Sequence, residues 1–312
     1  MRNVAAMIGG GLIGRSWAMV FARAGWRVRI FDSVASQLDV ARGEIERGLA
    51  EQQRYGLTDD ATAAAARVEY IADLEQALAG VDWVQENAPE VLDVKRELYP
   101  RIDRATPSSA IIASSTSAIP ASRFTERLAG RARCLVAHPV NPPHLVPVVE
   151  LCGAPWTDAA TVERARAVMT GIGQVPITVT RELDGFILNR LQGALLSEAL
   201  RLVGEGYVSP DDLDKTVQDG LGLRWSFIGP FATIELNAPG GVADYCARYA
   251  GFYRTLAAEP PAPAVWDAGN VAKVTSQLPP TGTAAERDAR MRWRDTRLLA
   301  LRQHKRATPD SD

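Results

Sequence analysis

A glycine-rich turn near the start of the chain constrains the fold more than any other feature of the sequence. The segment MIGGGLIGRSW places Gly9, Gly11 and Gly14 between an apolar run over Val4–Ile8 and a stretch with the apolar spacing of a helix. An alternating segment then leads to Asp32, which lies 18 residues after Gly14. A strand, turn, helix and second strand with an acid at this distance predict a dinucleotide-binding unit.

Each residue of this turn has its own physical reason. Gly9 permits the tight turn, Gly11 lets the backbone approach a pyrophosphate, and Gly14 lets the helix pack closely on the strand. The Asp32 carboxylate would accept a hydrogen bond from a ribose 2′-hydroxyl and repel a 2′-phosphate, which favours NAD over NADP. A structural turn without a ligand is the alternative, and the joint match of glycines, strands and acid argues against it.

The order of the predicted elements indicates two domains. Strand and helix patterns alternate up to Arg181, which predicts a mostly parallel sheet with helices on both faces. The patterns after it are helical, and we expect the final segment, RQHKRATPDSD, to be frayed. The sequence therefore predicts an α/β, Rossmann-type, doubly wound NAD-binding domain over residues 1–182. An all-α domain for substrate binding and dimerisation is expected over residues 183–312.

Composition excludes several classes of partner. A net charge of −2 provides no electrostatic attraction to nucleic acid or to an anionic membrane, so we expect neither partner. No apolar run is long enough to span a bilayer, and the first residues do not form the pattern of a signal peptide. The three cysteines, Cys134, Cys152 and Cys246, form no CxxC pair, which favours a reducing, cytoplasmic location.

The scarcity of histidine narrows the choice of a general base. Of the three histidines, His138 follows a predicted strand at its carboxyl end, where open parallel sheets bind ligands. Oxidation of an alcohol by hydride transfer needs a base for the hydroxyl proton, and imidazole is the usual one near neutral pH. Glu150, twelve residues later, could orient that ring. A metal pair of His138 and His144 is the alternative, but no cysteine or third histidine is near, so no metal is expected.

Further segments occur in order along the chain: ENAPE followed by Lys95, then SSTS, HPVNPP, VVEL and DGFILNRL. Together with the glycine turn, they resemble the 3-hydroxyacyl-CoA dehydrogenase family over nearly the whole chain. The segments LGLRWSFIGPF, the ELNA that follows and RWRDTRLLAL resemble the L-gulonate 3-dehydrogenase branch of that family, which includes lambda-crystallin.

The resemblance implies a catalytic group of four residues. Ser117, in SSTS, would donate a hydrogen bond to the substrate oxygen, and His138 would be the general base. Glu150 would pair with His138, and Asn189, in GFILNR, would help to hold the substrate oxygen. From the residues alone, Ser117 could instead be a local cap and Asn189 part of a polar helix face.

The resemblance also implies contacts with NAD beyond the glycines and Asp32. Leu12 and Ile13 would line the dinucleotide turn, and Asn141 would position the nicotinamide amide. Glu90 and Lys95 would lie near the nicotinamide and its ribose.

We expect an NAD-dependent dehydrogenase that oxidises the 3-hydroxyl of a small L-3-hydroxy acid, converting L-gulonate to 3-dehydro-L-gulonate. Pro139 and Val140 follow the histidine where the acyl-CoA enzymes have two aromatic residues, which favours the gulonate branch. Arg224 could bind the free carboxylate of such a substrate, or could be a surface arginine packed on Trp225.

Three other functions remain as alternatives. They are oxidation of an L-3-hydroxyacyl-CoA such as 3-hydroxybutyryl-CoA, oxidation of carnitine, and a non-catalytic, crystallin-like role in binding NAD. No recess for the quaternary ammonium of carnitine can be placed in the sequence. The four intact catalytic positions argue against a non-catalytic role. The resemblance further implies a homodimer built through the helical domain.

Overall fold

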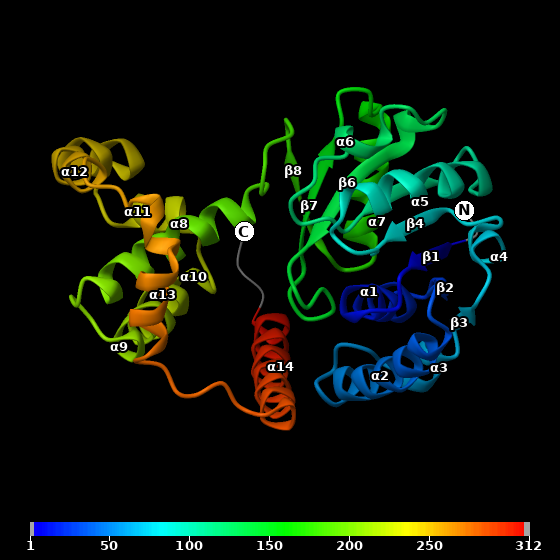
Figure 1. Cartoon of the computed structure of the whole chain (residues 1–312), viewed down its shortest axis with the longest axis horizontal. Coiled ribbons are helices and arrows are strands. Elements are labelled where there is room, and N and C mark those ends of the chain that lie inside the picture. Colours follow the sequence, from blue (N-terminus) through cyan, green and yellow to red (C-terminus); the bar gives the residue numbers. More distant parts are fainter. Residues whose placement is uncertain (1–2, 309–312) are drawn as a thin grey trace. The chain divides into compact units, whose positions relative to one another are not determined.

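The computed structural model describes residues 3–308 and consists of two compact units (Figure 1). Of the described residues, the first unit contains 3–189 and 289–308, and the second unit contains 190–288. Each unit is described separately below.

The first unit is built on an eight-stranded sheet. Its strands are β1 (Val4–Ile8), β2 (Arg27–Phe31), β3 (Val68–Ile71), β4 (Trp83–Glu86), β5 (Ile111–Ser114), β6 (Cys134–Pro139), β7 (Val148–Gly153) and β8 (Val175–Val179). They lie in the order β3-β2-β1-β4-β5-β6-β7-β8, and every neighbouring pair is parallel except β6 and β7. The predicted mostly parallel, doubly wound sheet is therefore confirmed.

Helices cover both faces of this sheet. The helices between its strands are α1 (Leu12–Arg23), α2 (Ala35–Arg54), α3 (Ala61–Ala65), α4 (Leu74–Leu78), α5 (Leu92–Ala105), α6 (Ser122–Thr125) and α7 (Ala159–Gly171), with a 3₁₀ turn, η1 (Arg131–Arg133). Successive side chains of a strand point to opposite faces, so Ala5 and Met7 of β1 pack with α1, α2 and α7. Ile8, on the opposite face, packs with α4, α5 and α6.

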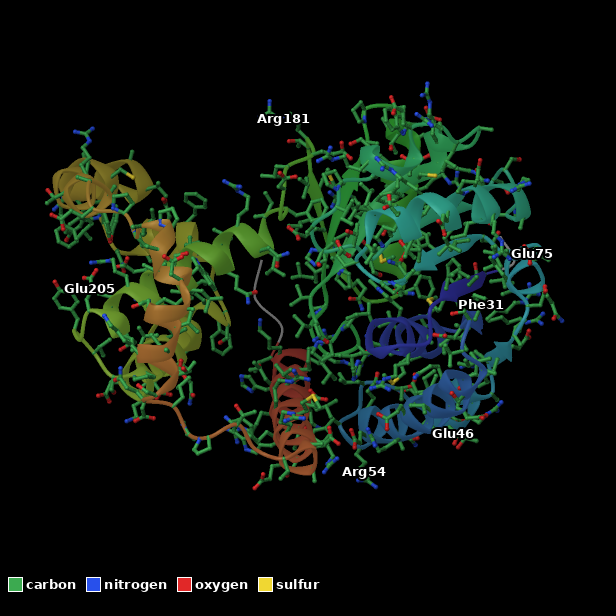
Figure 2. All side chains as sticks on the ribbon, in the orientation of Figure 1. Phe31, Glu46, Arg54, Glu75, Arg181 and Glu205 are labelled. Atoms are coloured by element: carbon green, nitrogen blue, oxygen red, sulfur yellow. The ribbon has the colours of Figure 1, made fainter. Side chains whose placement is uncertain are left out.

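The helix α2 shows how the sequence pattern produces this packing. Ile45 and Leu49, four residues apart, are fully buried in the core cluster that also contains residues of α1 and of the sheet. Glu46 and Arg54 are exposed, and Figure 2 shows both side chains pointing away from the sheet. The apolar stripe that suggested a helix in this part of the sequence is thus the face that packs against α1, α3 and β3.

The chain order of the strands reverses beside β1. This strand pairs with β2 on one side and with β4 on the other, so the connections after β1 and β4 leave the sheet in opposite directions. Open α/β sheets bind ligands at the carboxyl ends of the strands at such a point. The glycine turn follows β1 here, and Asn87 follows β4.

The last helix, α14 (Ala284–Ala307), corrects one prediction. The segment RQHKRATPDSD was expected to be frayed, but residues 302–307 are helical, while residues 309–312 lie outside the described part. Leu299 of α14 is buried, Arg302 donates to the carbonyl of Leu145, and Arg306 donates to the carbonyl of Gly56. These contacts hold the helix on the first unit, whereas the predicted division assigned all of residues 183–312 to the second domain.

The second unit is helical, and no strand occurs in residues 190–288. Its elements are α8 (Leu188–Gly204), α9 (Pro210–Lys215), a π-helical turn η2 (Thr216–Leu221), α10 (Gly222–Trp225), α11 (Pro230–Leu236), α12 (Gly241–Ala257), a 3₁₀ turn η3 (Pro263–Trp266) and α13 (Ala268–Thr275). Ser209 caps α9 by accepting a hydrogen bond from the Asp212 amide, as its position before Pro210 predicts. Across residues 3–308, no helix is both long enough and apolar enough to span a membrane.

Candidate active site

The glycine turn between β1 and α1 is tightly packed on one side, where no side chain would fit, and is open on the other. Gly9 has a φ of +108°, and a Cβ there would lie 2.8 Å from the Asn87 carbonyl oxygen. A Cβ on Gly14 would lie 1.8 Å from the carbonyl oxygen of Gly9, so the helix can approach the turn only with glycine there. A Cβ on Gly11 would meet nothing within 4 Å. The turn therefore has an open side on which a ligand could reach the start of α1.

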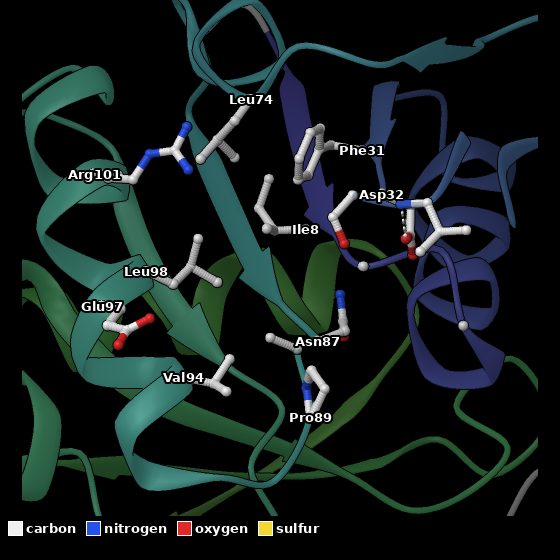
Figure 3. Close-up of a pocket in the computed structure, with 15 residues that line it drawn as sticks. Ile8, Phe31, Asp32, Leu74, Asn87, Pro89, Val94, Glu97, Leu98 and Arg101 are labelled. Atoms are coloured by element: carbon white, nitrogen blue, oxygen red, sulfur yellow. Dashed lines mark hydrogen bonds between the residues drawn. The ribbon is translucent and has the colours of Figure 1, made fainter. Parts of the chain in front are cut away.

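A cavity of about 790 Å³ lies beside this turn. Figure 3 shows Ile8 and Phe31 from strand ends, Leu74 from the start of α4, and Leu98 from α5 around it. Arg101 of α5 also lines the cavity and forms an ion pair of 2.9 Å with Glu75. The walls are thus mainly apolar, which suits an adenine ring.

Asp32 provides the acid of the cavity (Figure 3). Its Oδ2 accepts a hydrogen bond of 2.7 Å from the Gly10 amide, and its Oδ1 accepts one of 2.9 Å from the Val34 amide. These two bonds orient the carboxylate, and each oxygen keeps a lone pair for a hydroxyl donor. Apolar walls, an oriented acid and a glycine cradle at a helix start together fit the adenosine and phosphates of NAD.

The antiparallel pairing of β6 and β7 brings His138 directly opposite Glu150. The Nδ1 atom of His138 lies 2.7 Å from Oε2 of Glu150, and both side chains are buried. Since a carboxylate can only accept, Nδ1 donates the hydrogen bond, and the other ring nitrogen, Nε2, is left to exchange a proton with a substrate.

The second oxygen of Glu150 connects this pair to the start of α8. Oε1 accepts hydrogen bonds of 2.8 Å from the Ile187 amide and 3.0 Å from the Leu188 amide. Burial raises the pKa of Glu150, but the hydrogen bonds from His138 and from these two amides outweigh it, so the pKa is lowered overall. Glu150 is therefore held as a carboxylate against the imidazole, with the Phe186 ring 5.6 Å from the His138 ring.

Asn189, the next residue of α8, is bonded to the loop that carries Ser117. Its Nδ2 donates a hydrogen bond of 2.8 Å to the backbone carbonyl of Ser117. His138, Glu150, the first turn of α8, Asn189 and Ser117 are thus joined by successive hydrogen and covalent bonds within the first unit. The structure links the four residues that the resemblance assigned to catalysis.

The remaining predicted cofactor residues are placed differently from one another. Leu12 is exposed at the start of α1, whereas Ile13 packs on the core, and Asn141 is exposed on the loop after β6. Lys95 is buried and forms hydrogen bonds of 2.9 and 3.0 Å with both carboxylate oxygens of Glu86. The structure therefore does not bring the Lys95 ammonium to the cavity.

Two residues near the turn were missed by the sequence interpretation. Asn87 lines the cavity and accepts a hydrogen bond of 2.7 Å from Ser115, while Glu86 is the buried partner of Lys95. Both belong to the ENAPE segment, in which only Glu90 was predicted to contact the cofactor. The Glu90 carboxylate itself accepts hydrogen bonds from Thr116 and from backbone amides of the Ser117 loop.

His144, which lies on the loop between β6 and β7, has surroundings unlike those of His138 in β6. Its Nδ1 is buried and has no hydrogen-bond partner among residues 3–308. Burial, together with the positive charges of Arg23, Arg294 and Arg15, lowers the pKa of His144 to about 3. Within the described chain, no cluster of three or more histidine, cysteine or acidic side chains could hold a metal.

Arg224 lies on α10 in the second unit and is exposed. No acidic side chain among the described residues forms an ion pair with it, and the neighbouring Trp225 is also exposed. The guanidinium is therefore available for a ligand, although the structure of this unit alone does not assign one.

Two family models match consecutive parts of the chain. The model described as the NAD-binding domain of 3-hydroxyacyl-CoA dehydrogenase matches residues 4–183, and the model of its C-terminal domain matches residues 185–276. The lambda-crystallin homolog of Bos taurus is 43% identical over 311 residues, which cover 97% of this chain and 96% of that protein.

Similarity also extends to proteins with other named activities. The L-carnitine dehydrogenase of Streptomyces coelicolor is 40% identical over 76% of this chain and 74% of its own. The solved structure of a 5-formyl-3-hydroxy-2-methylpyridine 4-carboxylic acid 5-dehydrogenase, described as NAD⁺-dependent, superposes with a TM-score of 0.84. It is 28% identical, and the match covers 97% of this chain and 98% of that one.

Proposed function

Since the chain belongs to the 3-hydroxyacyl-CoA dehydrogenase family, we propose that it oxidises the 3-hydroxyl of a small L-3-hydroxy acid, with L-gulonate converted to 3-dehydro-L-gulonate. Family membership makes the protein an NAD-dependent oxidoreductase that acts on a CH–OH group. The observation that carries the proposed chemistry is the buried pair of His138 and Glu150, joined through α8 to Asn189 and Ser117.

In this reaction His138 is the general base. The Nε2 atom takes the proton of the substrate hydroxyl, and the negative charge of Glu150 stabilises the imidazolium that forms. Asn189 keeps one amide hydrogen and its carbonyl oxygen beyond the bond to Ser117, and with the Ser117 hydroxyl it would hold the reacting oxygen. NAD, when bound, supplies the hydride acceptor.

The choice between a free hydroxy acid and an acyl-CoA thioester as the substrate rests on the proposed role of Arg224. A free hydroxy acid carries a carboxylate at C1, whereas an acyl-CoA thioester does not. A guanidinium binds a carboxylate through two parallel hydrogen bonds, and Arg224 has no acidic partner among residues 3–308. We therefore assign this arginine to the substrate carboxylate.

Three alternative functions are supported to different degrees by the similar proteins and by the site. Oxidation of 3-hydroxybutyryl-CoA is supported by the description of both family models, and oxidation of carnitine by the similarity to L-carnitine dehydrogenase. A non-catalytic role is suggested only by the crystallin name of the similar proteins, and the hydrogen-bonded His138–Glu150 pair argues against it.

The experiment compares L-gulonate, other free L-3-hydroxy acids, carnitine and 3-hydroxybutyryl-CoA as substrates with NAD. We expect free acids to have the higher kcat/KM. The Arg224→Met variant should raise KM for the acid about tenfold or more, since losing a hydrogen bond to a charged group costs roughly 1.5–3 kcal/mol. Arg254→Met, at another exposed arginine of the second unit, is the matched control. A kcat/KM for 3-hydroxybutyryl-CoA well above that of every free acid would contradict the proposal.

We further propose that the protein is a cytoplasmic homodimer. The second unit exposes large apolar side chains, among them Phe231 and Leu236, each 75% exposed. A second copy of the chain would cover such a surface, and the few cysteines suit a reducing compartment. Light scattering at micromolar concentration should give twice the mass of the chain, and a monomer mass would contradict this.

A further inference from the structure

The loop that carries Ser117 is held by two carboxylates from a different part of the chain. This loop, residues 115–119, follows β5. Oε1 of Glu90 accepts hydrogen bonds from the Thr116 hydroxyl and from the amides of Ala118 (3.1 Å) and Ile119 (3.3 Å). The backbone on the far side of Ser117 is therefore bound to the segment between β4 and α5.

The second carboxylate acts on the near side of Ser117. Oε2 of Glu86 accepts a hydrogen bond of 2.6 Å from the Ser114 hydroxyl, whose oxygen accepts one of 3.1 Å from the Thr116 amide. Glu86 is fully buried, and Lys95 neutralises it through both carboxylate oxygens. The ion pair thus keeps a charged acceptor under the loop without leaving an unpaired charge in the core.

Thr116 is the residue on which both sets of contacts meet. Its amide donates to Ser114, its hydroxyl donates to Glu90, and its hydroxyl oxygen accepts a hydrogen bond of 2.9 Å from the Ile119 amide. The side chain is 1% exposed. Because Thr116 precedes Ser117 directly, these contacts fix the backbone from which the Ser117 side chain leaves.

We propose that Thr116, held by Glu90 and by the Ser114–Glu86–Lys95 chain of contacts, is a positioning residue for the Ser117 hydroxyl. The inference rests on the proposed function, because it assumes that Ser117 holds the reacting oxygen. It gives Glu90 and Lys95 a role other than the cofactor contact expected from the sequence: both stabilise the loop on which the substrate is aligned. Asn189 completes the arrangement by binding the Ser117 carbonyl.

The test is Thr116→Val, which removes the hydroxyl and keeps the shape of the side chain. Thr125→Val is the matched control, because Thr125 is also buried and its hydroxyl also donates one hydrogen bond, to Ala121, and accepts one, from Trp156. Thr125 lies at the end of α6, and neither of these two hydrogen bonds involves the Ser117 loop. Each substitution is made in the full chain, alone and together with Ser117→Ala.

We expect Thr116→Val to lower kcat/KM for the best substrate about tenfold or more, because small misplacements of a reacting group are costly. The Kd for NADH, measured by fluorescence, should not change, and Thr125→Val should turn over normally. In the Ser117→Ala background, Thr116→Val should have almost no further effect, because the hydroxyl it positions is absent.

Two results would overturn the inference. One is a Thr116→Val variant that loses no more kcat/KM than Thr125→Val, and the other is an equal loss with and without Ser117→Ala. If circular dichroism shows that Thr116→Val is not folded, Ser114→Ala replaces it under the same criteria. A Ser117→Ala variant with normal turnover would instead overturn the proposed role of Ser117, so the two failures are distinguishable.

Discussion

The two units of the chain achieve order in different ways. In the first, both faces of a sheet are covered, and side chains as large as Trp17, Trp83 and Tyr99 are fully buried. In the second, Val203, Ala238 and Val274 are the buried apolar residues, while large aromatic and aliphatic side chains remain exposed. The first unit is thus specified by its own interior, whereas the second buries few apolar side chains, and the proposed dimer would cover some of those it exposes.

Ion pairs show the same contrast. The first unit contains the buried pair Lys95–Glu86 and the nearly buried pair Arg133–Asp103, both between different elements. Within residues 190–288, every ion pair joins side chains three or four residues apart. Charge therefore contributes to the tertiary structure of the first unit and mainly to local helix structure in the second.

The largest effect should come from His138, the proposed general base. All four proposed catalytic residues lie in the first unit. His138→Gln should lower kcat by about 10²–10⁴, the usual cost of losing a positioned general base. NADH affinity should be unchanged, because the ring is not part of the cavity beside the glycine turn. His304→Gln, near the end of α14, is the control. Near-normal turnover of His138→Gln would remove this residue from the mechanism.

The next effect concerns the stability of the first unit. Lys95→Met leaves Glu86 buried without its counterion, which should cost about 3–5 kcal/mol in the free energy of unfolding. Denaturant unfolding measures it. The double variant Glu86→Gln/Lys95→Met should recover part of this loss, because it removes both charges. A double variant less stable than Lys95→Met would show that the ion pair is not the source of the effect.

A smaller effect is expected from pH, and it concerns His144, on the loop between β6 and β7. The pKa of His144 is lowered to about 3, chiefly by burial, so this ring stays neutral in the folded protein at pH 5. In the unfolded chain His144 binds a proton below a pH of about 6.5. The free energy of unfolding therefore falls as the pH decreases from there towards 3. Between pH 7 and pH 5 this costs about 2 kcal/mol.

The His144→Gln variant should therefore lose about 2 kcal/mol less than the original protein over this interval in denaturant unfolding. Glu150 does not interfere, because its lowered pKa contributes stability that is lost only as the pH falls below the range of an unfolded glutamic acid. Equal pH dependence in the two proteins would mean that His144 binds a proton in the folded state.

The sequence predicted the glycine turn, the strands and the identity of the His138–Glu150 pair because these depend on local spacing and on motifs. It could not predict that Lys95 is buried, because a helical lysine nine residues from Glu86 has the pattern of a solvent-exposed charge. The helical structure of residues 302–307 was not predicted for a similar reason: a polar segment near the end of the chain suggests fraying, yet Arg302 and Arg306 donate to backbone carbonyls of the first unit. Both errors arise from long-range packing, which overrides local polarity.

The smallest effect is expected from the second unit. Lys215, at the end of α9, pairs with Asp211 at 2.5 Å and Asp212 at 3.3 Å, and all three side chains are exposed. Water screens such pairs and the lysine loses side-chain entropy in forming them, so Lys215→Ala should leave the Tm unchanged within error. Lys215→Ala and Lys95→Met are measured at the same protein and salt concentrations, because salt screens the surface pair far more than the buried one. A Tm loss as large as that of Lys95→Met would mean that α9 is covered in the assembled protein and that its ion pairs are interior ones.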